Sequence, residues 1–137
     1  MGLKLLIEKE GKILFEVPLF PDDWQETALK REVEQLRRDI RRHMKFYAAF
    51  TNENRVRMLQ CLLEGEDHTV TFKAFQDDLG LNPKIIRENA VKLQDIGLVE
   101  SPCRGAYRLS RRGQGSFMMM LISLRRLMQA MMEDEEE

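Results

Sequence analysis

The 137-residue sequence predicts an α+β protein, mainly α with small β, in which one compact domain carries an N-terminal β-hairpin and long flanking helices. Three observations predict this class. Apolar residues recur every three or four positions over 29–50. Helix start and stop signals alternate over 51–97. Short runs of β-branched and aromatic residues surround glycine turns near residues 11 and 105.

The first segment, 1–21, is predicted to be a β-hairpin arm. Gly11 can adopt the positive φ that a tight hairpin turn needs, and Pro18 and Pro21 end the strand pairing. A lone two-stranded hairpin is marginal in water, so the arm must either pack on its own domain or pair with a partner chain.

The next segment, 22–50, is predicted to be one long amphipathic helix that begins at Asp22. Its apolar side chains are spaced alternately four and three residues apart, which is typical of a helix that packs against another helix. The partner helix lies either in the same chain or in a second copy. The seam residues expected at a dimer interface are Leu29, Val33, Leu36 and Ile40.

The segment 51–112 has the order helix, helix, tight turn, helix and two-stranded ribbon. Asn82 and Pro83 supply start signals for the third helix, 83–96, and Gly97 stops it. Two short strands follow within 98–109, joined by a turn that carries Arg104 at its tip. This order is that of a winged helix-turn-helix, whose recognition helix enters the DNA major groove.

Three stretches carry a resemblance to a known family, namely TNENRVRMLQCLLEG, DDLGLNPKIIRENAVKLQDIGLVE and GAYRLSRRG. They resemble the opening helix, the turn with recognition helix and first wing strand, and the second wing strand of arsenic-repressor-like winged-helix transcription regulators. The resemblance covers residues 46–113, about half of the chain. It implies a DNA-binding regulator of transcription. The cysteine pair with which metal-sensing members bind metal has no counterpart at 68–73, so no metal site is expected.

Rotation at 3.6 residues per turn places Ile86, Ala90 and Leu93 on the buried side of helix 83–96. The opposite side is then either an ordinary solvated face or a face for DNA, where basic side chains donate to guanine or phosphate and apolar ones touch thymine methyls. Glu88 departs from the basic or polar residue usual in the family, and could accept from cytosine N4. The residues predicted to bind DNA are Lys84, Ile85, Arg87, Glu88, Val91, Lys92, Arg104, Arg108 and Arg111.

The net charge of −1 conceals a basic patch beside an acidic tail. Residues 133–137 are all acidic, and the rest of the chain has 22 basic and 18 acidic side chains. Between residues 101 and 132 there are six arginines and no acid. This distribution favours binding to a polyanion, and the tail is expected to be disordered and solubilising.

The segment 113–132 is predicted to be a C-terminal dimerisation helix. It is apolar over more than half of its circumference and holds six of the nine methionines, an adaptable surface for a helix partner. The alternative is that this helix and the seam of 22–50 cover only each other. The residues of this helix expected at the dimer interface are Phe117, Leu121, Leu124 and Met128.

No enzyme signature is present, and no cofactor is expected. The sequence has no glycine-rich phosphate loop, no nucleophile with a nearby base and no paired carboxylates in a plausible cleft. Cys61 is expected in the core and Cys103 in an exposed turn, where its thiol could be oxidised. Neither has partners at zinc-ligand spacing.

The expected partners are double-stranded DNA and a second copy of the chain, and no membrane. Lys4 and Glu8 interrupt the first apolar stretch, so no secretory signal is expected. No apolar run approaches the ~20 residues needed to cross a bilayer. A cytoplasmic protein with reduced thiols is therefore expected. The alternative function is a winged-helix protein–protein interaction module in a larger assembly, without sequence-specific DNA binding.

Overall fold

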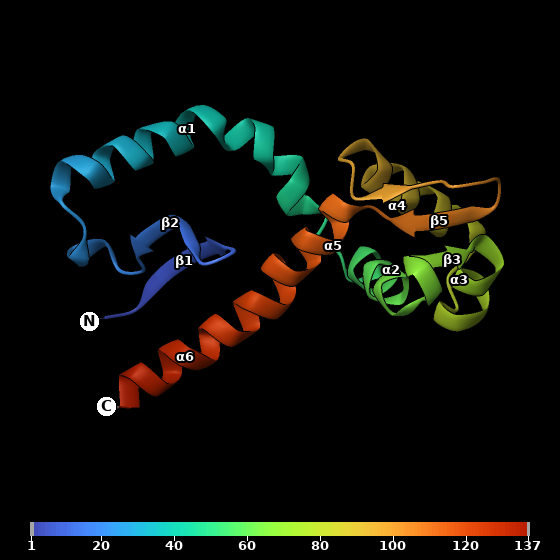
Figure 1. Ribbon diagram of the computed structural model, residues 1–137. Coiled ribbons are helices and arrows are strands. Elements are labelled where there is room, and N and C mark those ends of the chain that lie inside the picture. The colour runs from blue at the N-terminus through green and yellow to red at the C-terminus, as the bar shows by residue number, and fades with distance from the viewer. Residues whose placement is uncertain (1, 137) are drawn as a thin grey trace. The chain divides into compact units, whose positions relative to one another are not determined.

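The computed structural model describes residues 2–136 and shows an α+β chain (Figure 1). It contains two compact units, residues up to His43 and residues from Met44 onward, and the boundary falls within a long helix. The elements in chain order are β1 (Lys4–Lys9), β2 (Lys12–Pro18), a 3₁₀ turn η1 (Pro21–Asp23), α1 (Glu26–Ala48), α2 (Glu53–Glu64), a 3₁₀ turn η2 (Glu66–His68), β3 (Thr69–Thr71), α3 (Phe72–Leu79), α4 (Pro83–Asp95), β4 (Val99–Glu100), β5 (Ala106–Leu109), α5 (Arg111–Phe117), a π-helical segment η3 (Met118–Ser123) and α6 (Leu124–Glu136).

The first unit begins with the predicted hairpin. Glu10 and Gly11 form its turn with φ angles of 50° and 81°, so both central residues have the positive φ of a type I′ turn. The antiparallel strands β1 and β2 place Leu5 opposite Val17. The next pair on the same face of the hairpin, Ile7 and Phe15, is also apolar, so this face is apolar over these two neighbouring pairs.

The long helix α1 begins later than the sequence indicated. Helix formation was predicted from Asp22, but Pro21–Asp23 form a 3₁₀ turn and α1 starts at Glu26. The reason lies at Trp24, whose backbone is extended and whose indole Nε1 donates to the carbonyl oxygen of Pro18 at 2.8 Å. This bond ties the segment before the helix to the end of β2.

The first unit has no core of its own. None of its described residues, from Gly2 to His43, is buried. In α1, the seam residues Val33, Leu36 and Ile40 are 46%, 49% and 36% exposed. The first unit therefore presents apolar side chains that no other residue of the unit covers.

The second unit is built around α2, α3, α4 and a small antiparallel sheet (Figure 1). Its core draws on every one of these elements, because each turns an apolar side inward. The large side chains with less than 2% exposure are Met58, Leu59, Leu62, Phe75, Ile86, Leu93, Leu98 and Leu109.

The sheet has the order β3–β5–β4, with both neighbours antiparallel to the central strand. The ribbon of β4 and β5 was predicted, but β3 was not. The second predicted helix of the segment 51–112 is α3, which begins at Phe72 because Thr71 Oγ1 accepts from the backbone N–H of Ala74 at 3.1 Å. Thr69–Thr71 also pair with β5 before that helix begins.

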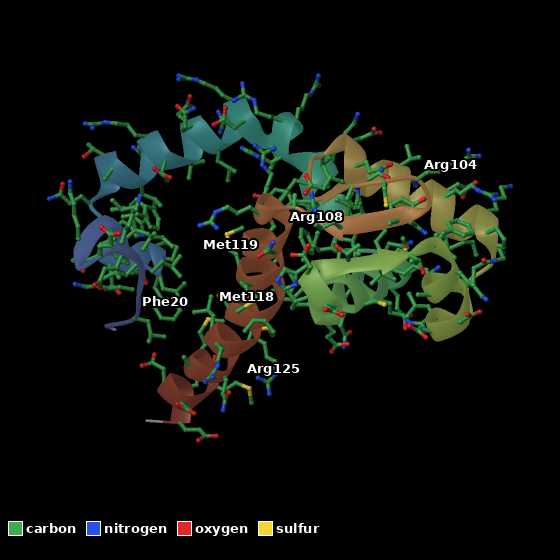
Figure 2. The ribbon with its side chains drawn as sticks, turned by 45° about the vertical axis from the view of Figure 1, so that its right-hand side comes forward. Phe20, Arg104, Arg108, Met118, Met119 and Arg125 are labelled. Atoms are coloured by element: carbon green, nitrogen blue, oxygen red, sulfur yellow. The ribbon has the colours of Figure 1, made fainter. Side chains whose placement is uncertain are left out.

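The C-terminal helices run from α5 through η3 into α6, away from α2, α3 and α4 (Figure 1), with Met118, Met119 and Arg125 labelled in Figure 2. The acidic tail was expected to be disordered. The helix instead continues to Glu136, so the acidic residues 133–136 are helical. Glutamate has good helix propensity and no glycine or proline interrupts this run.

One residue predicted for the dimer interface lies elsewhere. Phe117 is only 6% exposed and belongs to the core of the second unit, against which Leu121 also packs. Leu124 and Met128, in contrast, are 47% and 54% exposed. The four interface residues of this helix were predicted from α-helical spacing. The wider turns of η3 break that spacing, so the residues after η3 lie on a different face of the helix from Phe117.

Candidate nucleic-acid interface

The turn between α3 and α4 is fixed at both ends by its sequence. Gly80 ends α3 with a left-handed φ of 65°, and its N–H donates to the carbonyl oxygen of Gln76. Asn82 then caps α4, because its side-chain oxygen accepts from the backbone N–H of Ile85 at 2.9 Å. Pro83 occupies the first helical position, where the missing N–H costs nothing.

The rotation of α4 agrees with its periodicity. Ile86, Ala90 and Leu93 are buried, as predicted. On the outer side, Val91 is 52% exposed, although it is apolar, and Ile85 is half-buried at the edge. The charged side chains exposed on this helix include Lys84, Arg87, Glu88 and Lys92.

Glu88 has a partner on its own helix. The ammonium nitrogen of Lys84 lies 3.9 Å from Oε1 of Glu88, and both side chains are more than half exposed. An exposed pair of this kind contributes little to stability, so both groups are available to other partners. The outer side of α4 thus offers hydrogen-bond donors and one acceptor.

The ribbon of β4 and β5 is the second exposed part of the candidate interface. Its turn includes Gly105 at φ 80°, and the hydroxyl of Ser101 donates to the carbonyl oxygens of Cys103 and Ala106, both at 2.9 Å. Arg104 is exposed at the outer end of this turn, whereas Arg108 lies nearer to α5 (Figure 2). Arg108 donates from Nε to Oε1 of Glu100 across the ribbon at 2.9 Å.

Two contacts join the outer side of α4 to the ribbon. The guanidinium of Arg87 lies over the ring of Phe72, 5.2 Å from its centroid, in a cation–π arrangement. The backbone N–H of Phe72 donates to the carbonyl oxygen of Gly105 at 2.9 Å. Because Gly105 follows Arg104, these contacts place Arg87 and the arginine-tipped turn on neighbouring parts of one surface.

Arg111 is exposed in the first turn of α5. The position of this turn is fixed by Ser110, whose Oγ accepts from the N–H of Gly113 at 2.9 Å and donates to the carbonyl oxygen of Gly97 at 2.6 Å. The same residue's N–H donates to the carbonyl oxygen of Leu98. The end of the ribbon and the start of α5 are therefore held together.

Sequence reasoning missed a buried polar pair behind α4. Nη1 of Arg55 donates to Oδ1 of Asn89 at 3.0 Å, and the amide of Asn89 donates to the carbonyl oxygen of Ile85 at 2.9 Å. Asn89 is 7% exposed and lies between Ile86 and Leu93 on the inner side of the helix. That position was the available signal, because an amide on a buried stripe requires hydrogen-bond partners.

Cys103 is exposed in the ribbon turn as expected, whereas Cys61 is partly buried and packs beside the core and not within it. Burial raises the pKa of the Cys61 thiol above its ordinary value, and the negative charges of Asp78 and Glu64 raise it further. Cys61 is accordingly a weak nucleophile.

Residues 2–136 contain no group of three or more histidine, cysteine or acidic side chains placed to hold a metal ion. Within the same residues, no helix has both the length and the apolar character needed to span a bilayer.

No protein-family model matches this sequence, and no curated protein matches it.

Proposed function

We propose that this chain is a dimeric DNA-binding regulator of transcription of the winged helix-turn-helix type. In this proposal α4 is the recognition helix in the major groove, and the ribbon of β4 and β5 is the wing on the DNA backbone or in the minor groove. The observation that carries the proposal is the pair of contacts through Phe72 that joins the Arg87 side of α4 to the turn bearing Arg104.

The chemistry of the outer side of α4 suits base edges as well as phosphates. Lys84 and Arg87 can donate to guanine O6 and N7, and Glu88 can accept from cytosine N4. Val91 is apolar and half exposed, and it can touch a thymine methyl group. The burial of Ile86 and Leu93 fixes which way this side faces.

The ribbon and the start of α5 supply phosphate contacts in the proposal. Arg104 and Arg111 are exposed, and Arg108 can exchange its bond to Glu100 for one to a phosphate. Contacts to the DNA backbone position a protein without reading the base sequence. In the proposal these arginines therefore set the position of the protein on the duplex and its affinity, and α4 recognises the bases.

The exposed apolar faces support the dimer. In α1 the seam at Leu36 and Ile40 is uncovered within its unit, and so are Leu124 and Met128 in α6. Exposed apolar faces of this kind are uncommon on monomeric proteins, and on each helix such a face marks an interface. A two-fold dimer would present two copies of α4 to successive major grooves, about 34 Å apart on a roughly palindromic site.

The experiment that tests the function is selection of bound duplexes from a random pool, followed by salt titration of the selected duplex. Affinity is expected to fall steeply between roughly 50 and 200 mM salt, in proportion to the phosphates neutralised. Lys84→Glu and Arg104→Glu are each expected to reduce the salt slope by about one or more. Lys30→Glu in α1 makes the same charge change at an exposed lysine outside the proposed interface, and is the matched control.

Equal duplex binding by all three variants and the unsubstituted chain would exclude the proposed function as a DNA-binding regulator.

The hairpin supports a second candidate function, a winged-helix interaction module in a larger assembly. Its apolar face includes Ile7 and Phe15, 55% and 44% exposed, which DNA binding does not use. This candidate gains if duplex binding is absent while Ile7→Lys abolishes association with a partner protein.

A further inference from the structure

A cavity of about 290 Å³ lies in the second unit, where residues from the end of α1, from α2 and from α4 meet. It is separate from the outer side of α4 apart from Lys92, which lines it. Lys45 and Arg55 also line it, and Asp95 adds a carboxylate. The charged lining therefore has three cations and one anion.

Arg55 is the unusual member of this lining. It is 8% exposed, and its two terminal nitrogens donate to Oδ1 of Asn89 and to the carbonyl oxygen of Ala48, at 3.0 and 2.8 Å. Its Nε is buried and has no hydrogen-bond partner among the described residues. Both acceptors are neutral, and Arg55 is in none of the ion pairs of residues 2–136.

A buried guanidinium without a counter-charge is unfavourable, because burial removes its hydrating water and two neutral acceptors replace only part of that stabilisation. Arginine has five N–H donors, so the neutral acceptors of Asn89 and Ala48 leave donor capacity unused. A carboxylate in the cavity would supply the missing counter-charge, because Arg55 lines the cavity and a guanidinium forms strong hydrogen bonds to carboxylate oxygens.

The rest of the wall is apolar. Ala48, Ala49 and Ile96 line the cavity beside the cations, and Ala49 is almost fully buried. A volume of this size holds about ten water molecules and lies at the lower limit of small-molecule pockets. It therefore suits a ligand with an apolar body as well as a charged group.

We propose that this cavity binds a small organic carboxylate. The carboxylate accepts from the guanidinium of Arg55, the positive charges of Lys45 and Lys92 in the lining outweigh the single carboxylate of Asp95, and the apolar body packs on Ala49 and Ile96. The site stands independently of the proposed function, because its argument uses the charge and burial of the lining and not DNA.

The test uses the full chain labelled with ¹⁵N and three probes: phenylacetate, the neutral isostere phenylacetamide, and acetate. Phenylacetate is expected to shift the backbone signals of Ala49 and Ile96 and the Nε–H signal of Arg55 in a saturable way. Phenylacetamide, which lacks the charge, is expected to bind at least about tenfold more weakly. Acetate, which lacks the apolar body, is expected to bind more weakly than phenylacetate as well.

Two exposed lysines of α4 make a matched pair of variants. Lys92→Gln removes a cation of the cavity and is expected to weaken phenylacetate binding several-fold. Lys84→Gln removes a cation two turns away on the same helix and is expected to leave the affinity unchanged. Neither substitution disturbs the buried Arg55, so a folding defect does not confuse the result.

The proposal is overturned by no saturable binding of phenylacetate, by equal affinity for phenylacetamide or acetate, by shifts that miss the cavity residues, or by equal losses in the two lysine variants.

Discussion

Gly113 is the position where one added methyl group is expected to do most damage. It lies in the first turn of α5, directly after the ribbon. A Cβ at Gly113 would overlap the carbonyl oxygen of Leu98 and lie 2.7 Å from Cδ1 of Leu109. That carbonyl also accepts the N–H of Ser110 at 3.0 Å, so it cannot turn aside freely.

The size of the effect follows from these contacts. Ordinary non-bonded carbon contacts lie near 3.5–4.0 Å, so α5 would have to move by roughly 1 Å. Overpacking typically costs about 1–3 kcal/mol, and an obstructing backbone atom places Gly113→Ala at the upper end. Alanine's better helix propensity returns about 0.5–1 kcal/mol. We expect a net loss of about 2 kcal/mol, or a fall in Tm of about 10 °C.

Gly115→Ala is the matched control, because it makes the same change in the same helix. A Cβ at Gly115 meets nothing within 4 Å. Only the propensity gain then applies, so the variant is expected to be more stable by about 0.5–1 kcal/mol. The two substitutions should shift stability in opposite directions.

Thermal unfolding followed by circular dichroism measures both variants against the unsubstituted chain. All three must be at one protein concentration, since association makes Tm concentration-dependent. If Gly113→Ala is as stable as Gly115→Ala, the close approach of α5 to Leu98 is refuted, and with it the fixed junction between the ribbon and α5.

Three further predictions concern buried groups and association. Asn89→Ala leaves Nη1 of Arg55 without its acceptor and should destabilise the chain by about 1–3 kcal/mol in urea denaturation; an unchanged midpoint would contradict the buried pair. At pH 8 iodoacetamide should modify Cys103 well before Cys61, because burial lowers the thiolate fraction of Cys61. Raising the pH above 9.0 should narrow the difference in modification rate between the two thiols, and mass spectrometry of the peptides measures both rates. Leu36→Lys places a charge in the apolar seam and should shift a dimer toward monomer in sedimentation velocity, whereas a clean monomer from the unsubstituted chain at micromolar concentration would exclude the dimer.

The local structure of the second unit was largely predictable because its signals are short-range. Asn82 and Pro83 set the start of α4, and β5 falls within the residues expected for the second strand of the ribbon. The inner and outer sides of α4 follow from helix periodicity alone. These features depend on residues within a few positions of each other.

The rest depends on contacts between residues far apart in the sequence. β3 has three residues, too few for a pattern, and exists through its pairing with β5. The bond between Arg55 and Asn89 joins residues 34 positions apart; the position of Asn89 on the buried stripe indicates that it needs a partner but not that the partner is Arg55. The π-helical turns of η3 likewise have no signature in the methionine-rich sequence, so the sequence did not separate Phe117, which lies in the core, from the exposed Leu124 and Met128.

The register between β4 and β5 places Glu100 opposite Arg108, so Arg108 already has a carboxylate partner within its own ribbon. Glu100 is thus a built-in counter-ion for Arg108. In the proposed DNA complex, a phosphate that engages Arg108 would have to replace this carboxylate. Random polyanions would then be held less firmly than the arginines alone suggest, because only a well-placed phosphate would compensate for the bond to Glu100.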